Sequence, residues 1–108
     1  MTDGSKSFAV GDGEEVYEPF EAGQVAWLRR DEQVVAGLWV CAPEEQPGIH
    51  EAEFEQNETI HILEGRVRVE IVGGETHELG AGDIASFVKG TVGRWKVLEP
   101  VKEFFVYS

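Results

Sequence analysis

The chain has 108 residues, of which 42% are hydrophobic, and this length and composition fit one globular domain with a single core. Its 21 acidic residues outnumber 9 Lys and Arg, and the formal net charge of −12 argues against nucleic acids and membranes as partners. We expect neither a signal peptide nor a membrane span. The single cysteine, Cys41, permits no intrachain disulfide, so we predict a cytoplasmic protein.

The first half of the chain contains a polar arm and then strand patterns. Residues 1–14 are polar and glycine-rich, and we assign them to an N-terminal arm, with one domain over 15–108. Val34–Val40 is a nearly continuous apolar run. Residues 58–72 alternate apolar and polar side chains, which is typical of a half-buried strand.

Turns and short strands fill the second half. Gly73-Gly74 predicts a two-residue hairpin, and Ile84–Val88 predicts the next strand. Two further strands, Trp95–Leu98 and Phe104–Tyr107, are expected on either side of a break at Pro100. Many short strands between turns predict an all-β barrel or sandwich.

Two groups of residues resemble the motifs of the cupin superfamily. Glu58 and Gly65 have the spacing of the first motif, and Gly82-Asp83 with Gly90 fits the second. Asn57–Gly65 and Gly90–Val97 are most similar to small single-domain cupins of the (S)-ureidoglycine aminohydrolase type, and also to ethanolamine-utilisation cupins. This resemblance implies an all-β, single-domain cupin β-barrel (a double-stranded β-helix of the jelly-roll type) and a link to ureide or amine metabolism.

The sequence departs from the family at its usual metal ligands. Counted back from Glu58, the two first-motif histidine positions fall on Glu51 and Glu53, or, with a gap one residue shorter, on Ala52 and Phe54. The second-motif histidine position falls on Gly93. We therefore expect no metal cofactor, since a tight transition-metal site in this fold wants about three imidazoles and one carboxylate.

The first-motif region still offers one histidine and several carboxylates as candidate ligands. His50 with Glu58 could form a residual metal site. Glu51, Glu53 and Glu55 alternate, and we interpret them as a solvated outer face rather than a cation-binding cluster, because lone carboxylates are rarely buried unpaired.

The C-terminal strand departs from the closest subgroup too. Glu103 and Phe105 stand where that subgroup commonly has lysine and tyrosine. If that lysine and tyrosine have a function in the relatives, we do not expect this chain to share it.

Strand periodicity selects the candidate ligand-binding residues. From Glu58 to Leu63 the period of two places Glu58, Ile60 and Ile62 inside and His61 outside, with Gly65 as the following turn. The predicted ligand-binding set contains one acid, one histidine and four aromatic residues: Glu58, His50, Trp39, Phe54, Trp95 and Phe105. Plain core packing is the alternative role for the aromatic residues.

The sequence favours a small-molecule-binding cupin of unassigned activity whose partner is a small polar metabolite. One alternative is a metal-assisted enzyme acting on a ureido or amino-acid substrate, and another is a non-catalytic sensing or interaction module. A third is a metal-free isomerase, with Glu58 as the base beside His50 or Tyr107. We expect a homodimer, since an open barrel edge is a liability unless covered.

Overall fold

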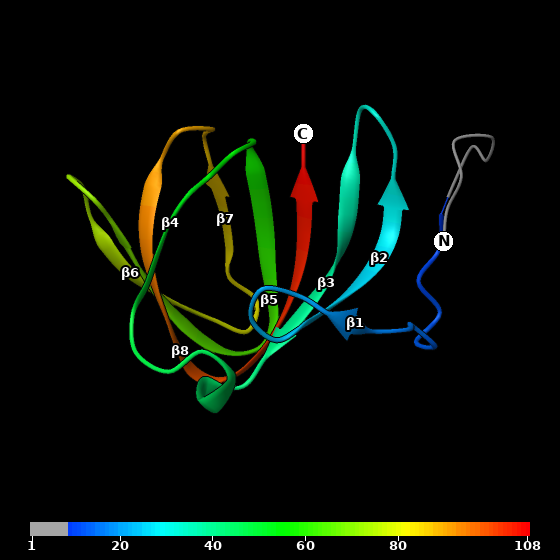
Figure 1. Ribbon diagram of the computed structural model, residues 1–108, viewed down its shortest axis with the longest axis horizontal. Helices are drawn as coiled ribbons and strands as arrows, with labels where there is room; N and C mark the ends of the chain where they lie inside the picture. The colour runs from blue at the N-terminus through cyan, green and yellow to red at the C-terminus, as the bar shows by residue number, and fades with distance from the viewer. Residues whose placement is uncertain (1–8) are drawn as a thin grey trace.

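The computed structural model describes residues 9–108, which form strands and one short 3₁₀ turn (Figure 1). In chain order the elements are β1 (Glu18–Pro19), β2 (Gln24–Arg30), β3 (Val35–Cys41), η1 (Pro43–Glu45), β4 (His50–Glu53), β5 (Glu58–Ile71), β6 (Thr76–Gly80), β7 (Ile84–Phe87) and β8 (Val92–Tyr107). The all-β expectation is confirmed. Within the described residues, no helix has the length and apolar character needed to cross a membrane.

All strands belong to one antiparallel sheet that curls on itself. The order β1-β2-β3-β8-β5-β6 is completed by β4 on β8 and β7 on β5. Strands β5 and β8 are the longest, with 14 and 16 residues, and Figure 1 shows both bending strongly through the molecule. Their curvature brings β4, β6 and β7 round to face β2 and β3.

The β5–β8 ladder decides which side chains point inward. The inward pairs, in order along the ladder, are Glu58–Tyr107, Ile60–Phe105, Ile62–Glu103, Val67–Val97 and Val69–Trp95. Ile60, Ile62, Val67 and Val69 are at most 1% exposed. At about 25 cal/mol per Å² of apolar surface removed from water, this double row supplies much of the driving force for folding.

Both long strands pass through their predicted breaks. The prediction that Gly65 ends its strand is wrong, and so is the prediction that Pro100 divides the last one. The ladder shifts register on both sides of Gly65, whose φ is +81°. Such a bulge bends a strand without ending it. A proline opposite the bulge lacks a backbone N–H, but the regular hydrogen-bond ladder is already interrupted there.

The β5–β6 hairpin is confirmed, but its connection is longer than two residues. Val72–Glu75 joins the strands, with Gly73 at φ +82°. The Gly74 amide donates to the Ile71 carbonyl, and the Ile71 amide donates to the Glu75 carbonyl, both at 2.8 Å. The longer connection still joins β5 and β6 as a hairpin. Only Gly73 in it needs a positive φ, which glycine adopts easily.

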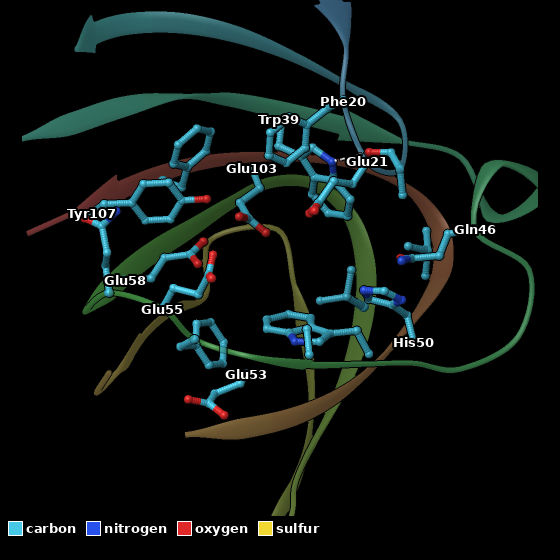
Figure 2. A pocket seen from close by; sticks show the side chains of 18 of the residues that line it. Phe20, Glu21, Trp39, Gln46, His50, Glu53, Glu55, Glu58, Glu103 and Tyr107 are labelled. Carbon is cyan, nitrogen blue, oxygen red and sulfur yellow. Dashed lines mark hydrogen bonds between the residues drawn. The ribbon is translucent and has the colours of Figure 1, made fainter. Parts of the chain in front are cut away.

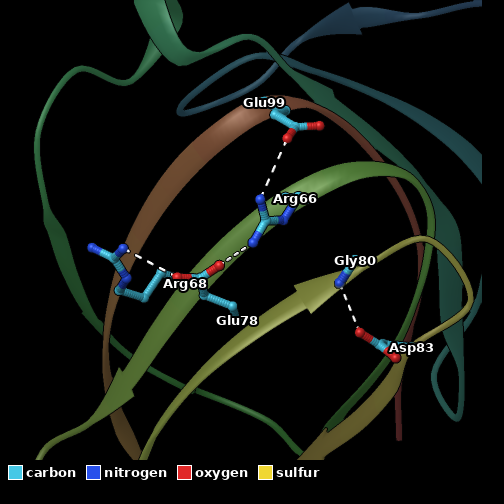
Figure 3. A network of polar contacts seen from close by, with 6 residues as sticks. All are labelled: Arg66, Arg68, Glu78, Gly80, Asp83 and Glu99. Atoms are coloured by element: carbon cyan, nitrogen blue, oxygen red, sulfur yellow. Dashed lines mark hydrogen bonds and ion pairs between the residues drawn. The ribbon is translucent and has the colours of Figure 1, made fainter.

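A polar network covers the outer face of β5 and β6, where Arg66 and Arg68 share the Glu78 carboxylate (Figure 3). Arg66 also lies 3.6 Å from Glu99 on β8. Beside this network, the Gly80 amide donates to Asp83 at 2.7 Å, across the turn before β7. These ion pairs are exposed and individually contribute little, about 0–1 kcal/mol each. The alternation of charged outer and apolar inner residues nevertheless fixes the strand register.

The close approach of the two long strands can be tested at Gly65. A Cβ there would lie 1.9 Å from the Pro100 carbonyl oxygen, whereas a Cβ at Gly73, which has nearly the same φ, would meet nothing within 4 Å. We expect Gly73→Ala to cost about 1–2 kcal/mol from left-handed backbone strain alone. Gly65→Ala should cost at least about 2 kcal/mol more, because the strands must separate. Urea denaturation of both variants measures the difference, and equal losses would show that the crossing is not tight.

Candidate functional site

The barrel encloses a cavity of about 450 Å³ that opens at one side (Figure 2). All six residues of the predicted ligand-binding set line it: Trp39, His50, Phe54, Glu58, Trp95 and Phe105. The strand periodicity predicted around Glu58 is confirmed. Ile60 and Ile62 are buried on the same inward face, and His61 does not line the cavity. A volume of this size suits a small metabolite.

Aromatic side chains form two walls. On one side, Phe54 and Phe87 stack with ring centroids 4.6 Å apart, and Trp95 meets both edge-on. On the other, Phe105 meets Trp27 edge-on at 5.9 Å and Tyr107 at 5.1 Å. Both arrangements are favourable for rings with a negative face and positive edge.

The positions of the Trp39 and Phe105 rings in this second wall depend on the neighbouring backbone. The Trp39 indole N–H donates to the Ala22 carbonyl at 2.7 Å, which holds that ring against the cavity. Gly37 leaves room for Phe105, because a Cβ there would lie 3.1 Å from the end of the Phe105 ring. The walls are therefore rigid and apolar.

One end of the cavity carries carboxyl and phenol groups. Figure 2 shows Glu58, Glu103 and Tyr107 pointing into the same space, with Glu55 beside Glu58. Glu103 is only 5% exposed, and no hydrogen bond or ion pair between residues 9–108 reaches its carboxylate. Glu58 and Tyr107 lie opposite each other on β5 and β8, and no side-chain hydrogen bond within residues 9–108 reaches the Glu58 carboxyl or the Tyr107 hydroxyl. Polar groups this deep normally have partners, so this end can accept hydrogen bonds from a ligand.

Burial perturbs the protonation of all three groups. Loss of hydration raises the pKa of Glu58 to about 7. Burial also raises the pKa of Glu103 well above its usual range, and the Glu58 charge adds to that effect. The Tyr107 pKa rises too, first through burial and then through the charges of Glu58 and Glu103. Tyr107 therefore stays a hydrogen-bond donor at neutral pH, while the two carboxyls resist ionising together.

The rest of the cavity is more open. Gln46 and His50 lie at the end away from Glu58, as Figure 2 shows. Glu21, Glu53 and Glu55 border the opening. Among the charged side chains that line the described cavity are five glutamates and one lysine, Lys96. The site is therefore strongly acidic between aromatic walls.

The placement of the first-motif carboxylates corrects one expectation. Glu51 does lie on the outer face, where its carboxylate accepts a 2.8 Å bond from Arg94. Glu53 and Glu55, however, are exposed at the cavity rim rather than on a separate outer face. Strand β4 ends at Glu53, so the alternation assumed for these residues stops before Glu55.

The residues at the family's metal positions do not fit a transition metal. Of the two possible alignments, the one on Ala52 and Phe54 faces the cavity, and Ala52 pairs directly with Gly93. A Cβ at Gly93 would lie 3.1 Å from the Trp95 indole nitrogen and 3.6 Å from the Phe54 ring. Aromatic rings thus occupy the space around these positions. No group of three or more His, Cys, Asp or Glu within residues 9–108 could hold a metal ion.

Sequence reasoning missed Glu103 as a site residue. A signal for it exists, because Val101, Glu103, Phe105 and Tyr107 share strand parity, which places a charge in an otherwise apolar row. The assumed break at Pro100 hid that this row continues the inner face of the barrel. Cys41 is buried, and burial raises the pKa of its thiol to about 11, so it is a poor nucleophile.

Comparison with known proteins identifies the fold. Residues 28–105 match the EutQ-like cupin domain, while no curated protein matches the chain. A DUF861 family protein from Thermotoga maritima is 35% identical, over 63% of this chain and 73% of that one, with a TM-score of 0.56.

Two more distant structures share the fold over nearly the whole chain. A putative ethanolamine utilization protein from Salmonella typhimurium is 18% identical, covering 93% of this chain and 91% of that one, with a TM-score of 0.71. An RmlC-like cupin from Shewanella frigidimarina is 14% identical, covering 95% and 90%, with a TM-score of 0.76. The all-β cupin barrel predicted from the sequence is thereby confirmed.

The raised pKa of Glu58 predicts a pH-dependent stability. The folded state holds this proton up to about pH 7, whereas the unfolded chain loses it near pH 4.5. The stabilisation is thus complete below about pH 4.5 and is lost as the pH rises through about 7. We expect Glu58→Gln to raise the free energy of unfolding by about 1–3 kcal/mol at pH 8 relative to wild type, with little change at pH 4.5.

Urea denaturation at both pH values measures this effect. Glu64→Gln, on the exposed side of β5, is the matched control and should show no such difference. A Glu58→Gln effect that is the same at both pH values would contradict the buried position of the carboxyl.

Proposed function

The chain belongs to the EutQ-like cupin domain family, and on that premise we propose that its cavity binds a small polar metabolite with an amine or ureido group. The supporting observation is the lining: five glutamates against one lysine, between aromatic walls. Carboxylates accept their strongest hydrogen bonds from charged N–H donors, and aromatic faces attract ammonium groups. An anionic ligand would meet repulsion at every acidic side chain.

The two ends of the cavity suggest how such a ligand is oriented. The N–H donors face Glu58, which accepts their hydrogen bonds beside Tyr107. A second polar group of the ligand reaches Gln46 and His50 at the opposite end. The aromatic walls contact the carbon chain between them. This arrangement supports reversible binding, and no metal takes part in it.

Binding can be measured through the protein's own fluorescence, because Trp27, Trp39 and Trp95 all line the cavity. Suitable probes are ethanolamine, methylurea and ethylammonium chloride, with sodium acetate as the anionic comparison. We expect at least one amine or urea to change the tryptophan emission saturably, and acetate to have no effect. Glu58→Gln should weaken the binding by about 10-fold or more, since a hydrogen bond to a charged group is worth about 1.5–3 kcal/mol.

Glu64→Gln, which lies outside the cavity, serves as the control and should bind like wild type. Saturable binding of acetate with no response to any amine or urea would contradict the proposal.

A second candidate function is metal-free proton transfer, because Glu58 lies directly opposite Tyr107 on the neighbouring strand. A base with a pKa of about 7 beside a protonated phenol is suited to removing and returning a carbon-bound proton. This function predicts exchange of the acidic carbon-bound proton between the nitrogen and the carbonyl group of a bound amino ketone, such as aminoacetone, when the mixture is held in heavy water. Proton NMR detects the loss of signal, which Glu58→Gln should abolish. Binding without exchange for every probe would exclude this candidate.

A further inference from the structure

The most buried carboxyl group in the cavity, that of Glu103, forms no hydrogen bond or ion pair within residues 9–108. Glu103 is 5% exposed and lies opposite Ile62 on β5 and Trp39 on β3. Its neighbours on the same inward face, Val101 and Phe105, are both 3% exposed. Leaving a bare carboxylate in such surroundings costs several kcal/mol, so the group must be protonated or meet a positive charge.

A second carboxyl shares this space. Glu58 projects from β5, and Figure 2 shows its oxygens directed toward the region that Glu103 faces. The charge of Glu58 opposes ionisation of Glu103. Two carboxyls that face one partly enclosed space do not ionise together easily, because the charge of one opposes ionisation of the other.

The surroundings do not supply a cation to neutralise this pair. The other titratable groups lining the cavity are Tyr107 and Lys96 on β8, His50 and Glu53 on β4, Glu55 after β4, and Glu21 between β1 and β2. Glu21 and Glu55 add negative charge near Tyr107. Lys96 is exposed at the rim, and β3 contributes only Trp39 to the described lining. A positive charge at the base of the cavity must therefore come from a ligand.

We propose that Glu58 and Glu103 form an ammonium subsite at the base of the cavity, and that a primary ammonium group enters it in exchange for one proton. This inference rests on the proposed function and narrows its ligand class to primary amines. At about pH 8 the empty pair carries a single negative charge, because Glu58 is ionised above about pH 7 while Glu103 keeps its proton. When an ammonium group enters, the proton on Glu103 leaves to solvent, and both carboxylates accept N–H bonds from the ligand. The ligand brings one positive charge and one proton departs, so the charge balances.

The exchange makes affinity depend on pH in a defined direction. Between about pH 7, where Glu58 ionises, and the higher pH at which Glu103 would lose its proton unaided, each binding event releases one proton, so affinity for ethylammonium should rise about tenfold per pH unit. At higher pH the dependence should flatten, while the probe itself stays charged up to about pH 10. Tetramethylammonium carries the same charge without N–H donors and should bind more weakly and release less than one proton.

The test mixes unmodified protein with ethylammonium chloride in weakly buffered solution at about pH 8, where Glu58 is already ionised. An indicator dye counts the released protons, and tryptophan emission reports binding. We expect about one proton per chain at saturation. Methylurea, which is neutral, should release none. Glu103→Gln should lose both the proton release and at least about tenfold in affinity at pH 8. Glu53→Gln, which removes a charge from the rim only, should keep the proton release.

The outcomes separate this inference from the proposed function. Saturable ethylammonium binding without proton release or pH dependence would overturn the subsite while leaving amine binding intact. Binding of methylurea with no response to ethylammonium would also overturn it and leave the ureido ligand class. No response to any amine or urea would reject both proposals. Proton release that persists in Glu103→Gln would assign the exchange to another group and overturn the role of Glu103.

Discussion

The antiparallel pairing of β5 with β8 is the interaction on which the rest of this molecule depends. The two strands run together from Glu58 opposite Tyr107 to Ile71 opposite Gly93, and they bend together where Gly65 approaches Pro100. Because side chains alternate across a sheet, this one register sends both the core and the cavity carboxyls to the same inner face. A shift by one residue would expose the core and bury the outer arginines.

The side of the cavity formed by β4 and β8 is built from small and aromatic residues. At the positions where the family carries histidine ligands, Ala52 and Phe54 face inward, and Gly93 is crowded by Trp95. Aromatic packing holds this side of the barrel together. The first-motif carboxylate, Glu58, faces a second acid, Glu103, across the cavity, and this arrangement suits hydrogen bonding to a ligand.

Burial of Glu103 without a partner lowers stability, and such a cost is typical of residues that act on a ligand. Its surroundings would accept a leucine or methionine more readily than a carboxyl group. The Glu58 charge also opposes ionisation of this acid, while Lys96 is exposed at the rim of the cavity. The carboxyl groups of the cavity therefore lack a hydrogen-bond donor or a positive charge until a ligand that supplies one enters.

The sequence by itself determined the all-β class, the hairpin at Gly73-Gly74, the inward direction of Glu58 and the six side chains around the cavity, because alternation and turn chemistry are local properties. Only the tertiary structure decided that Pro100 continues its strand, since the bulge that tolerates it lies on β5. It also decided that Glu103 joins Glu58. These residues are 45 positions apart, and no local pattern specifies which distant strands pair, although their pairing sets the charge of the site.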